Sequence, residues 1–121
     1  MTVEVKICGL DRPETVDGAV NAGAKMLGFV FYPPSPRNLT ASAASGLTNR
    51  VPASVKRVGL FVDPTDEMIT TVLNKNVLDL IQLHGNEPPE RVAEIKDITR
   101  LKVIKVLKVR DIRDLKYVSV Y

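Results

Sequence analysis

The chain contains one cysteine, Cys8, which ends a short apolar stretch and precedes Gly9. Side chains alternate between the two faces of an extended strand, so Cys8 and Lys6 are expected to share a face. A nearby ammonium group favours the thiolate form of a cysteine, and a thiolate can serve as a base or a nucleophile. A single cysteine is more often a packing residue, so the residue type alone leaves both roles open for Cys8.

Two candidate ligand-binding residues, Arg37 and His84, follow other apolar stretches. Arg37 ends the segment 32–37, whose prolines restrict the backbone and would hold a guanidinium with little loss of entropy. A guanidinium suits a carboxylate or a phosphate, and an ordinary surface role for Arg37 is the alternative. His84 is the only histidine and is expected to share a face with Gln82. One histidine cannot form a metal site by itself, and no metal site is predicted.

Two other polar features are interpreted structurally. Asp63 precedes Pro64 and is expected to form a turn or a helix cap. Lysine and arginine recur through residues 100–116, as they do in nucleic-acid-binding surfaces. The chain has no Trp, three Phe and three Tyr, so aromatic platforms for stacking bases are scarce. A solvated helix face is therefore favoured for this stretch, and no nucleic-acid partner is predicted.

Short apolar runs, rich in Val, Ile and Leu, lead into these polar residues. They occupy residues 3–7, 26–31, 56–62, 78–83 and 101–109. Runs of this length and composition are typical of buried parallel strands. The candidate residues lie at or just after the C-terminal ends of such strands, where α/β proteins bind their ligands.

Helix signals fill the segments between the runs. Asp11 and Glu14 resemble a capping box with Pro13 in the first turn, and Gly23 ends that helix. Further helices are expected at residues 41–49, 65–74, 90–98 and 110–116. This alternation requires a parallel sheet with helical crossovers.

Two α/β architectures fit this alternation, an open doubly wound sheet and part of a (β/α)8 barrel. The sequence has no GxGxxG after its first strand and no GxxxxGK[ST] motif, so the usual nucleotide-binding versions of the open sheet are disfavoured. Short helices in short repeating units fit a barrel, which needs at least ~200 residues for eight units. This chain has about five βα units, so the barrel alternative would be an incomplete one, with strands six to eight missing.

Composition narrows the class of protein. The 121 residues are 45% hydrophobic and 26% charged, with a formal net charge of +3, which is typical of a globular chain and excludes disordered and collagen-like classes. We expect a single domain over residues 1–121. The lone cysteine suggests a reducing compartment. No signal peptide and no apolar run of membrane-spanning length are found, so a cytoplasmic protein without a membrane partner is expected.

Five segments of the sequence occur in a fixed order: Lys6-Ile7-Cys8-Gly9-Leu10, Gly28-Phe29-Val30-Phe31, Ser35-Pro36-Arg37, Val58-Gly59-Leu60-Phe61-Val62 and Gln82-Leu83-His84-Gly85. Together they resemble the phosphoribosylanthranilate isomerase family of tryptophan biosynthesis. Residues 103–106 resemble the fifth strand of that family, so the resemblance extends from residue 3 to about 116. The first segment alone is a weak signal, and all five in register are specific.

The resemblance implies a complete (β/α)8 barrel that catalyses an Amadori rearrangement without a metal or an organic cofactor. The phosphorylated substrate, N-(5-phosphoribosyl)anthranilate, becomes 1-(2-carboxyphenylamino)-1-deoxyribulose 5-phosphate. The resemblance assigns the general base to Cys8 and contact with the anthranilate carboxylate to Arg37, and it places His84 at the mouth of the site. Lys6 and Arg37, with Lys105 as a further candidate, are expected to attract the anionic substrate.

The family's general acid is an Asp at the end of strand six, which is expected beyond Tyr121, as are the phosphate-binding loops. The 121-residue chain alone is therefore expected to be inactive. Its edge strands and the inner faces of its strands are expected to be exposed, and it is expected to associate with itself or with a missing C-terminal half. The alternative is a non-catalytic half-barrel fragment or assembly module of the same family.

Overall fold

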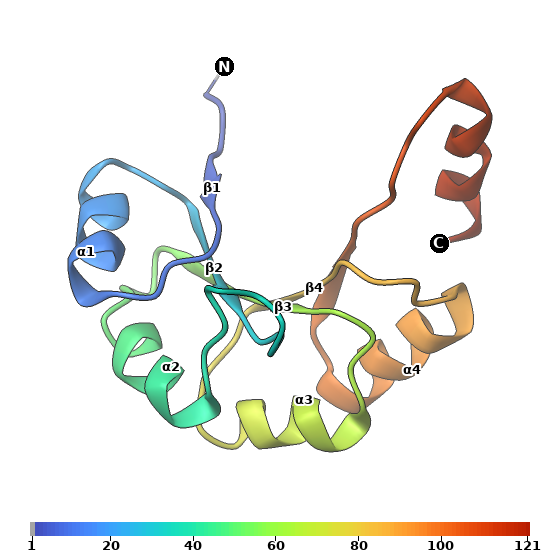
Figure 1. The fold of residues 1–121 in the computed structure, drawn as a ribbon. Coiled ribbons are helices and arrows are strands. Elements are labelled where there is room, and N and C mark those ends of the chain that lie inside the picture. The colour runs from blue at the N-terminus through green and yellow to red at the C-terminus, as the bar shows by residue number, and fades with distance from the viewer. Residues whose placement is uncertain (1) are drawn as a thin grey trace.

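The computed structural model describes residues 2–121, in which a parallel five-stranded sheet is covered on one side by an arc of helices (Figure 1). The strands are β1 (Lys6–Ile7), β2 (Met26–Val30), β3 (Lys56–Phe61), β4 (Leu80–Leu83) and β5 (Lys102–Lys105). The helices are α1 (Pro13–Asn21), α2 (Ala41–Thr48), α3 (Asp66–Leu73) and α4 (Pro89–Thr99), followed by a 3-10 helix, η1 (Ile112–Val120). The strands pair in chain order, which confirms the predicted parallel alternation. None of the helices in residues 2–121 is long and apolar enough to cross a membrane.

The face of the sheet that the helices cover, here called the helix face, holds the main hydrophobic core. Strand side chains such as Leu27, Phe29 and Ile81 are fully buried there against helix residues such as Ile69 and Ile95. Burying each side chain of this size contributes about 1.5–3 kcal/mol. The side chains at alternate positions point to the opposite face, here called the open face.

The open face of the central strands is more buried than the sequence suggests. Val30 and Leu60 are opposite each other in the register and are only 3% and 8% exposed, and Val58 is fully buried. The expectation that the inner faces of all the strands are exposed is therefore wrong for β2 and β3. The sheet curves inside its arc of helices (Figure 1), and a concave face brings the side chains of neighbouring strands closer together.

Threonine hydroxyls cap two of the helices, whereas the cap expected for the first helix is absent. The hydroxyls of Thr40 and Thr65 accept hydrogen bonds of 3.1 Å from the backbone N–H of Ala43 and Met68 and cap α2 and α3. The capping box expected at Asp11 is wrong, because the cap of α1 is Arg12, without a side-chain capping bond. Pro13 takes the first helical position, where its missing N–H costs nothing, and this places Asp11 one residue too early.

The strands are shorter than the apolar runs that predict them, most clearly at the two edges of the sheet. Only residues 6–7 of the run 3–7 and residues 102–105 of the run 101–109 form strands. Backbone pairing needs a neighbouring strand, and among residues 2–121 β1 and β5 each have one neighbour. The helix expected at 110–116 is instead the 3-10 helix η1, which buries no residue and begins with a capping box of Asp111 and Asp114.

Candidate active site

One cavity of about 480 Å³ opens at the C-terminal ends of the strands and brings together Cys8, Arg37, His84 and Lys6, which the sequence singles out for catalysis or binding. Its lining residues are Lys6, Cys8, Val30, Tyr32, Ser35, Arg37, Leu60, Val62, Gln82 and His84. Two of these side chains are cationic and none is a carboxylate. A cavity with this balance of charge attracts an anionic ligand.

Cys8 is held against the sheet by two glycines. The backbone N–H groups of Gly9 and Leu10 both donate to the carbonyl oxygen of Gly28, at 3.0 and 3.2 Å. A Cβ atom on Gly28 would lie 3.0 Å from the Cys8 sulfur and 3.2 Å from its Cα. The absence of a side chain at Gly28 therefore lets the half-buried free thiol of Cys8 lie against the neighbouring strand.

Arg37 folds back over the end of β1 and reaches the backbone of Cys8. Its Nη1 atom donates a hydrogen bond of 3.2 Å to the carbonyl oxygen of Cys8. The guanidinium occupies the space beside Gly9, where a Cβ atom would lie 2.1 Å from Nη1. The loop is fixed by turns in which Ser35 donates to the Tyr32 carbonyl and its own hydroxyl accepts from the backbone N–H of Arg37. Arg37 itself stays exposed, so its remaining donors are free to meet a ligand.

Replacing Gly9 with Ala is expected to displace Arg37 and to lower the stability of the protein by about 1–2 kcal/mol. Gly9 has a φ of +79°, which a side chain disfavours, and the new methyl group would occupy the position of the guanidinium. Thermal unfolding measures the loss. Gly18→Ala in α1 is the control, because no atom lies within 4 Å of a Cβ atom there and alanine favours a helix. A Gly9→Ala protein with an unchanged melting midpoint would contradict this account.

Gln82 and His84 reach the cavity from the end of β4. Gln82 is 8% exposed and lies opposite Leu60 and Ile104 in the register of the sheet. His84 is exposed, and its backbone N–H donates a 3.0 Å hydrogen bond to the Phe61 carbonyl. The backbone of His84 is thus anchored to β3 while its imidazole remains accessible.

Lys105 does not lie in the cavity, contrary to the expectation for this residue. It is opposite Leu83 in the register, and Leu83 packs in the core of the helix face. Its Nζ atom lies 2.6 Å from Oε1 of Glu87 and 2.8 Å from the Gly85 carbonyl oxygen. The side chains of Lys105 and Glu87 are only 8% and 1% exposed. The charge of Lys105 is therefore neutralised by Glu87 in a buried ion pair. Lys6 and Arg37 are the cations that line the cavity.

Glu87 is a buried carboxylate that the sequence does not reveal, because a glutamate in a loop is ordinarily solvated. Burial raises the pKa of Glu87, but the Lys105 ammonium and backbone N–H groups, including that of Asp63, outweigh it and hold the pKa below its usual value. Asp63 lies in a bend of the backbone and has a positive φ of 44°. The cap of α3 falls to Thr65 instead of Asp63.

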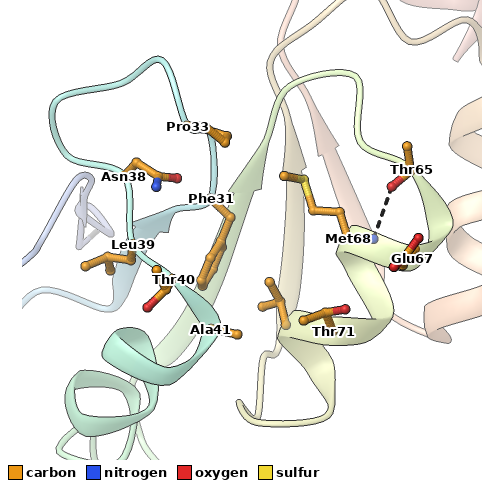
Figure 2. Close-up of a pocket in the computed structure, with 11 residues that line it drawn as sticks. Phe31, Pro33, Asn38, Leu39, Thr40, Ala41, Thr65, Glu67, Met68 and Thr71 are labelled. Atoms are coloured by element: carbon orange, nitrogen blue, oxygen red, sulfur yellow. Dashed lines mark hydrogen bonds between the residues drawn. The ribbon is translucent and has the colours of Figure 1, made fainter.

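A second cavity of about 390 Å³ lies on the helix side, between the first turns of α2 and α3 (Figure 2). Phe31 and Met68 project into it from opposite sides, and the Thr65 hydroxyl caps the backbone of Met68 beside it (Figure 2). Glu67 is the only ionisable residue in its lining. This second cavity has no cation and no thiol in its lining. The cavity around Cys8 has both and is therefore the better candidate site.

Comparisons with known proteins agree on one family. The model for the family N-(5'phosphoribosyl)anthranilate (PRA) isomerase matches residues 5–120. The N-(5'-phosphoribosyl)anthranilate isomerase of Paramagnetospirillum magneticum is 52% identical over 96 residues, which are 79% of this chain and 45% of that relative. The chain spans about half the length of the curated relatives that it matches.

Solved structures of the same enzyme share the fold. A crystal structure of phosphoribosyl anthranilate isomerase in complex with reduced 1-(o-carboxyphenylamino)-1-deoxyribulose 5-phosphate has a TM-score of 0.89 and 39% identity, over 95% of this chain and 58% of that one. A structure of monomers generated from the dimeric enzyme of Thermotoga maritima has a TM-score of 0.87 and 38% identity, over 97% of this chain and 58% of that one. The fold is thus a parallel α/β arrangement of five βα units that matches the barrels of this enzyme over about half their length. The chain belongs to the N-(5'-phosphoribosyl)anthranilate isomerase family.

Proposed function

We propose that these 121 residues act as part of a complete barrel, here called the intact protein, in which the remaining strands are supplied. The intact protein isomerises N-(5-phosphoribosyl)anthranilate to 1-(2-carboxyphenylamino)-1-deoxyribulose 5-phosphate in tryptophan biosynthesis. The observation that carries the proposal is the cavity that joins the Cys8 thiol to Lys6 and Arg37, with no carboxylate in its lining. A thiolate can take up a proton, and two cations suit a substrate that carries a carboxylate and a phosphate. The related structure bound to a reduced carboxyphenylamino-deoxyribulose phosphate supports this substrate class.

In the proposed reaction, Cys8 is the general base. It removes the C2′ proton of the ring-opened, protonated imine, which gives a neutral enolamine. The enolamine becomes the ketone product when C1′ gains a proton and the C2′ hydroxyl loses one. Opening of the furanose ring needs a proton from a general acid, for which the family resemblance implies an Asp outside residues 1–121. The reaction as proposed needs neither a metal nor an organic cofactor, because proton transfers alone interconvert the imine and the aminoketone.

Three residues are proposed to bind the substrate around this base. Arg37 would hold the anthranilate carboxylate through its planar donors, since its Nη1 contact with Cys8 places the guanidinium beside the base. Lys6 shares the open face with Cys8 and would contribute positive charge. His84 would contact the substrate at the mouth of the cavity, where its imidazole is exposed.

A direct assay of the intact protein tests the proposal. Purified protein is incubated with freshly prepared N-(5-phosphoribosyl)anthranilate, and the aminoketone product is followed by chromatography. We expect conversion at a rate that falls when the aminoketone's reduced analogue is added as a competitor. A folded, intact protein that leaves the substrate unchanged would contradict the proposal. We place this activity in the cytoplasm, as the single cysteine of the sequence suggests.

The coverage of about half of each relative supports a second candidate for the 121 residues taken alone. In this candidate they are a single domain, the N-terminal part of a barrel, which lacks catalysis and associates with itself or with a C-terminal half. The Thermotoga relative is described as dimeric, which supports self-association within the family. The same assay, made with the 121-residue polypeptide and with the intact protein, separates the two candidates.

Arg37→Lys in the intact protein is expected to raise KM for the substrate by about 10–100-fold, because the variant keeps the charge and loses the paired donors. Steady-state kinetics measure the change. An analogue that carries a phenyl ring in place of the carboxyphenyl ring is the control ligand, and its binding should be almost unaffected. Equal losses for the substrate and for this analogue would assign Arg37 to another part of the substrate.

A further inference from the structure

Glu87 lies in the loop between β4 and α4 and collects hydrogen bonds from three successive strand ends. Its Oε2 atom accepts from the backbone N–H of Asp63, after β3, at 2.8 Å. Its Oε1 atom accepts from the Gly85 N–H at 3.0 Å and lies 2.6 Å from Nζ of Lys105, on β5. One buried carboxylate thus ties together the C-terminal ends of β3, β4 and β5.

The same loops are also joined in the reverse direction. Oδ1 of Asp63 accepts a 2.9 Å hydrogen bond from the backbone N–H of Asn86. Gly85 lets this happen, because a Cβ atom at that position would lie 2.6 Å from the Asp63 carboxylate. The positive φ of Asp63 directs its N–H toward Glu87 and its carboxylate toward Asn86. Each acidic side chain therefore holds the loop that carries the other.

Neither Glu87 nor Asp63 lines the cavity around Cys8. Their hydrogen bonds nevertheless hold the backbone next to His84, which does line it. The residue after His84 is Gly85, whose N–H donates to Glu87 and whose carbonyl oxygen accepts from Lys105. The N–H of His84 itself donates to the Phe61 carbonyl. The backbone is thus fixed on both sides of His84, whereas the exposed imidazole makes no hydrogen bond within residues 2–121 that would hold it directly.

We propose that Glu87 is a positioning residue that, together with Lys105 and Asp63, holds His84 at the mouth of the site. The proposal rests on the proposed function, since His84 is a substrate-binding residue only in that reading. Loss of the Glu87 charge would leave the Lys105 ammonium buried without its ion-pair partner. A glutamine at this position has one acceptor oxygen in place of two, so at least one of the hydrogen bonds from Gly85, Asp63 and Lys105 would be lost. The peptide that carries the imidazole would then shift, and small shifts of a substrate-binding group are costly to the reaction.

Glu87→Gln in the intact protein tests this role, with Glu90→Gln as the matched control. Glu90 is an exposed glutamate in the first turn of α4, outside the cavity and the ion pair. We expect Glu87→Gln to lower kcat/KM by about 10–100-fold, mainly through KM. The assay is made at a temperature well below the melting temperature of the variant, so unfolding does not cause the loss. The imidazole signal of His84 in ¹³C,¹H NMR, assigned by its loss in His84→Asn, should shift in Glu87→Gln and stay in place in Glu90→Gln.

Asp63→Gly keeps the proposal testable if Glu87→Gln does not fold. Glycine accepts the positive φ of this position, the N–H to Glu87 remains, and only the bond to Asn86 is lost. We expect the same shift of the His84 signal, smaller in size, and a rise of a few-fold in KM. The proposal is overturned if the variants melt earlier while their His84 signals and kcat/KM match those of Glu90→Gln. Because the NMR signal does not depend on turnover, an intact protein without isomerase activity would refute the proposed function and leave the positioning role to be decided by the signal.

Discussion

Cys8→Ala in the intact protein is expected to reduce turnover by about 10²–10⁴-fold, the usual loss when a general base is removed. The structure gives a reason to expect an intact fold, because the Cys8 sulfur occupies space that Gly28 leaves open by having no side chain. Removing this sulfur leaves the backbone hydrogen bonds from Gly9 and Leu10 to the Gly28 carbonyl in place. The loss should appear in kcat, since alanine disturbs neither Lys6 nor Arg37.

Two measurements keep this result interpretable. Circular dichroism and thermal unfolding establish that the Cys8→Ala protein is folded, and Thr71→Ala, on the exposed surface of α3, gives the kinetics of a neutral variant. Cys8→Ser should be nearly as inactive as Cys8→Ala, because a hydroxyl of the same shape is a far weaker acid and is not ionised near neutral pH. A Cys8→Ala protein with the turnover of Thr71→Ala would show that another group takes the proton.

The polypeptide 1–121, made on its own, is expected to associate with itself and to lack isomerase activity. Its edge strand β1 continues from a segment in which Val3 and Val5 are 85% and 46% exposed. The segment after β5 exposes further apolar side chains, including Ile112 at 80%. Strand edges with unpaired backbone groups and exposed apolar residues promote association between chains. Analytical ultracentrifugation should therefore show species larger than a monomer.

The burial of Val30, Val58 and Leu60 limits how disordered this polypeptide should be. Association through its edges with the central strands intact predicts weak binding of the dye ANS, whereas a molten chain would bind it strongly. A separately made C-terminal half of the barrel, mixed with the polypeptide, should reduce the association and restore activity. A monodisperse monomer that unfolds sharply and turns over substrate by itself would refute this prediction.

The order of strands and helices could be predicted from the sequence because it depends on local patterns. Apolar runs such as those around Leu27, Leu60 and Ile81 indicate strands from neighbouring residues alone. The hydroxyls of Thr40 and Thr65 cap helices through residues only three positions away. Alternation along one strand also places Cys8 with Lys6, and His84 with Gln82. These four residues of the cavity lining could therefore be predicted from the sequence, although the role of each residue stays a prediction.

Features that depend on the register between strands could not be predicted in the same way. Lys105 is assigned to the helix face only once Leu83 is known to lie opposite it. Its partner Glu87 is 18 residues away, in a loop where no periodic pattern exists. The signal that could have located this pair is the Gly85-Asn86-Glu87 sequence after β4, but its meaning depends on the neighbouring Asp63, which the fold brings beside it. The length of β1 and β5 likewise depends on which strands lie beside them.

The order of the strands has a consequence for how the chain is made. Because β1 to β5 pair in the order of the sequence, each strand can join the edge left by the strand synthesised before it. At about 5–20 residues per second, a new βα unit leaves the ribosome every few seconds, which is long compared with helix and hairpin formation. The nascent sheet can therefore grow at one edge only, while β1 stays at the other edge with β2 as its one neighbour. The period of greatest risk for aggregation should be the time that β1 spends without a second neighbour, and a chaperone that shields nascent chains would be needed most at that strand.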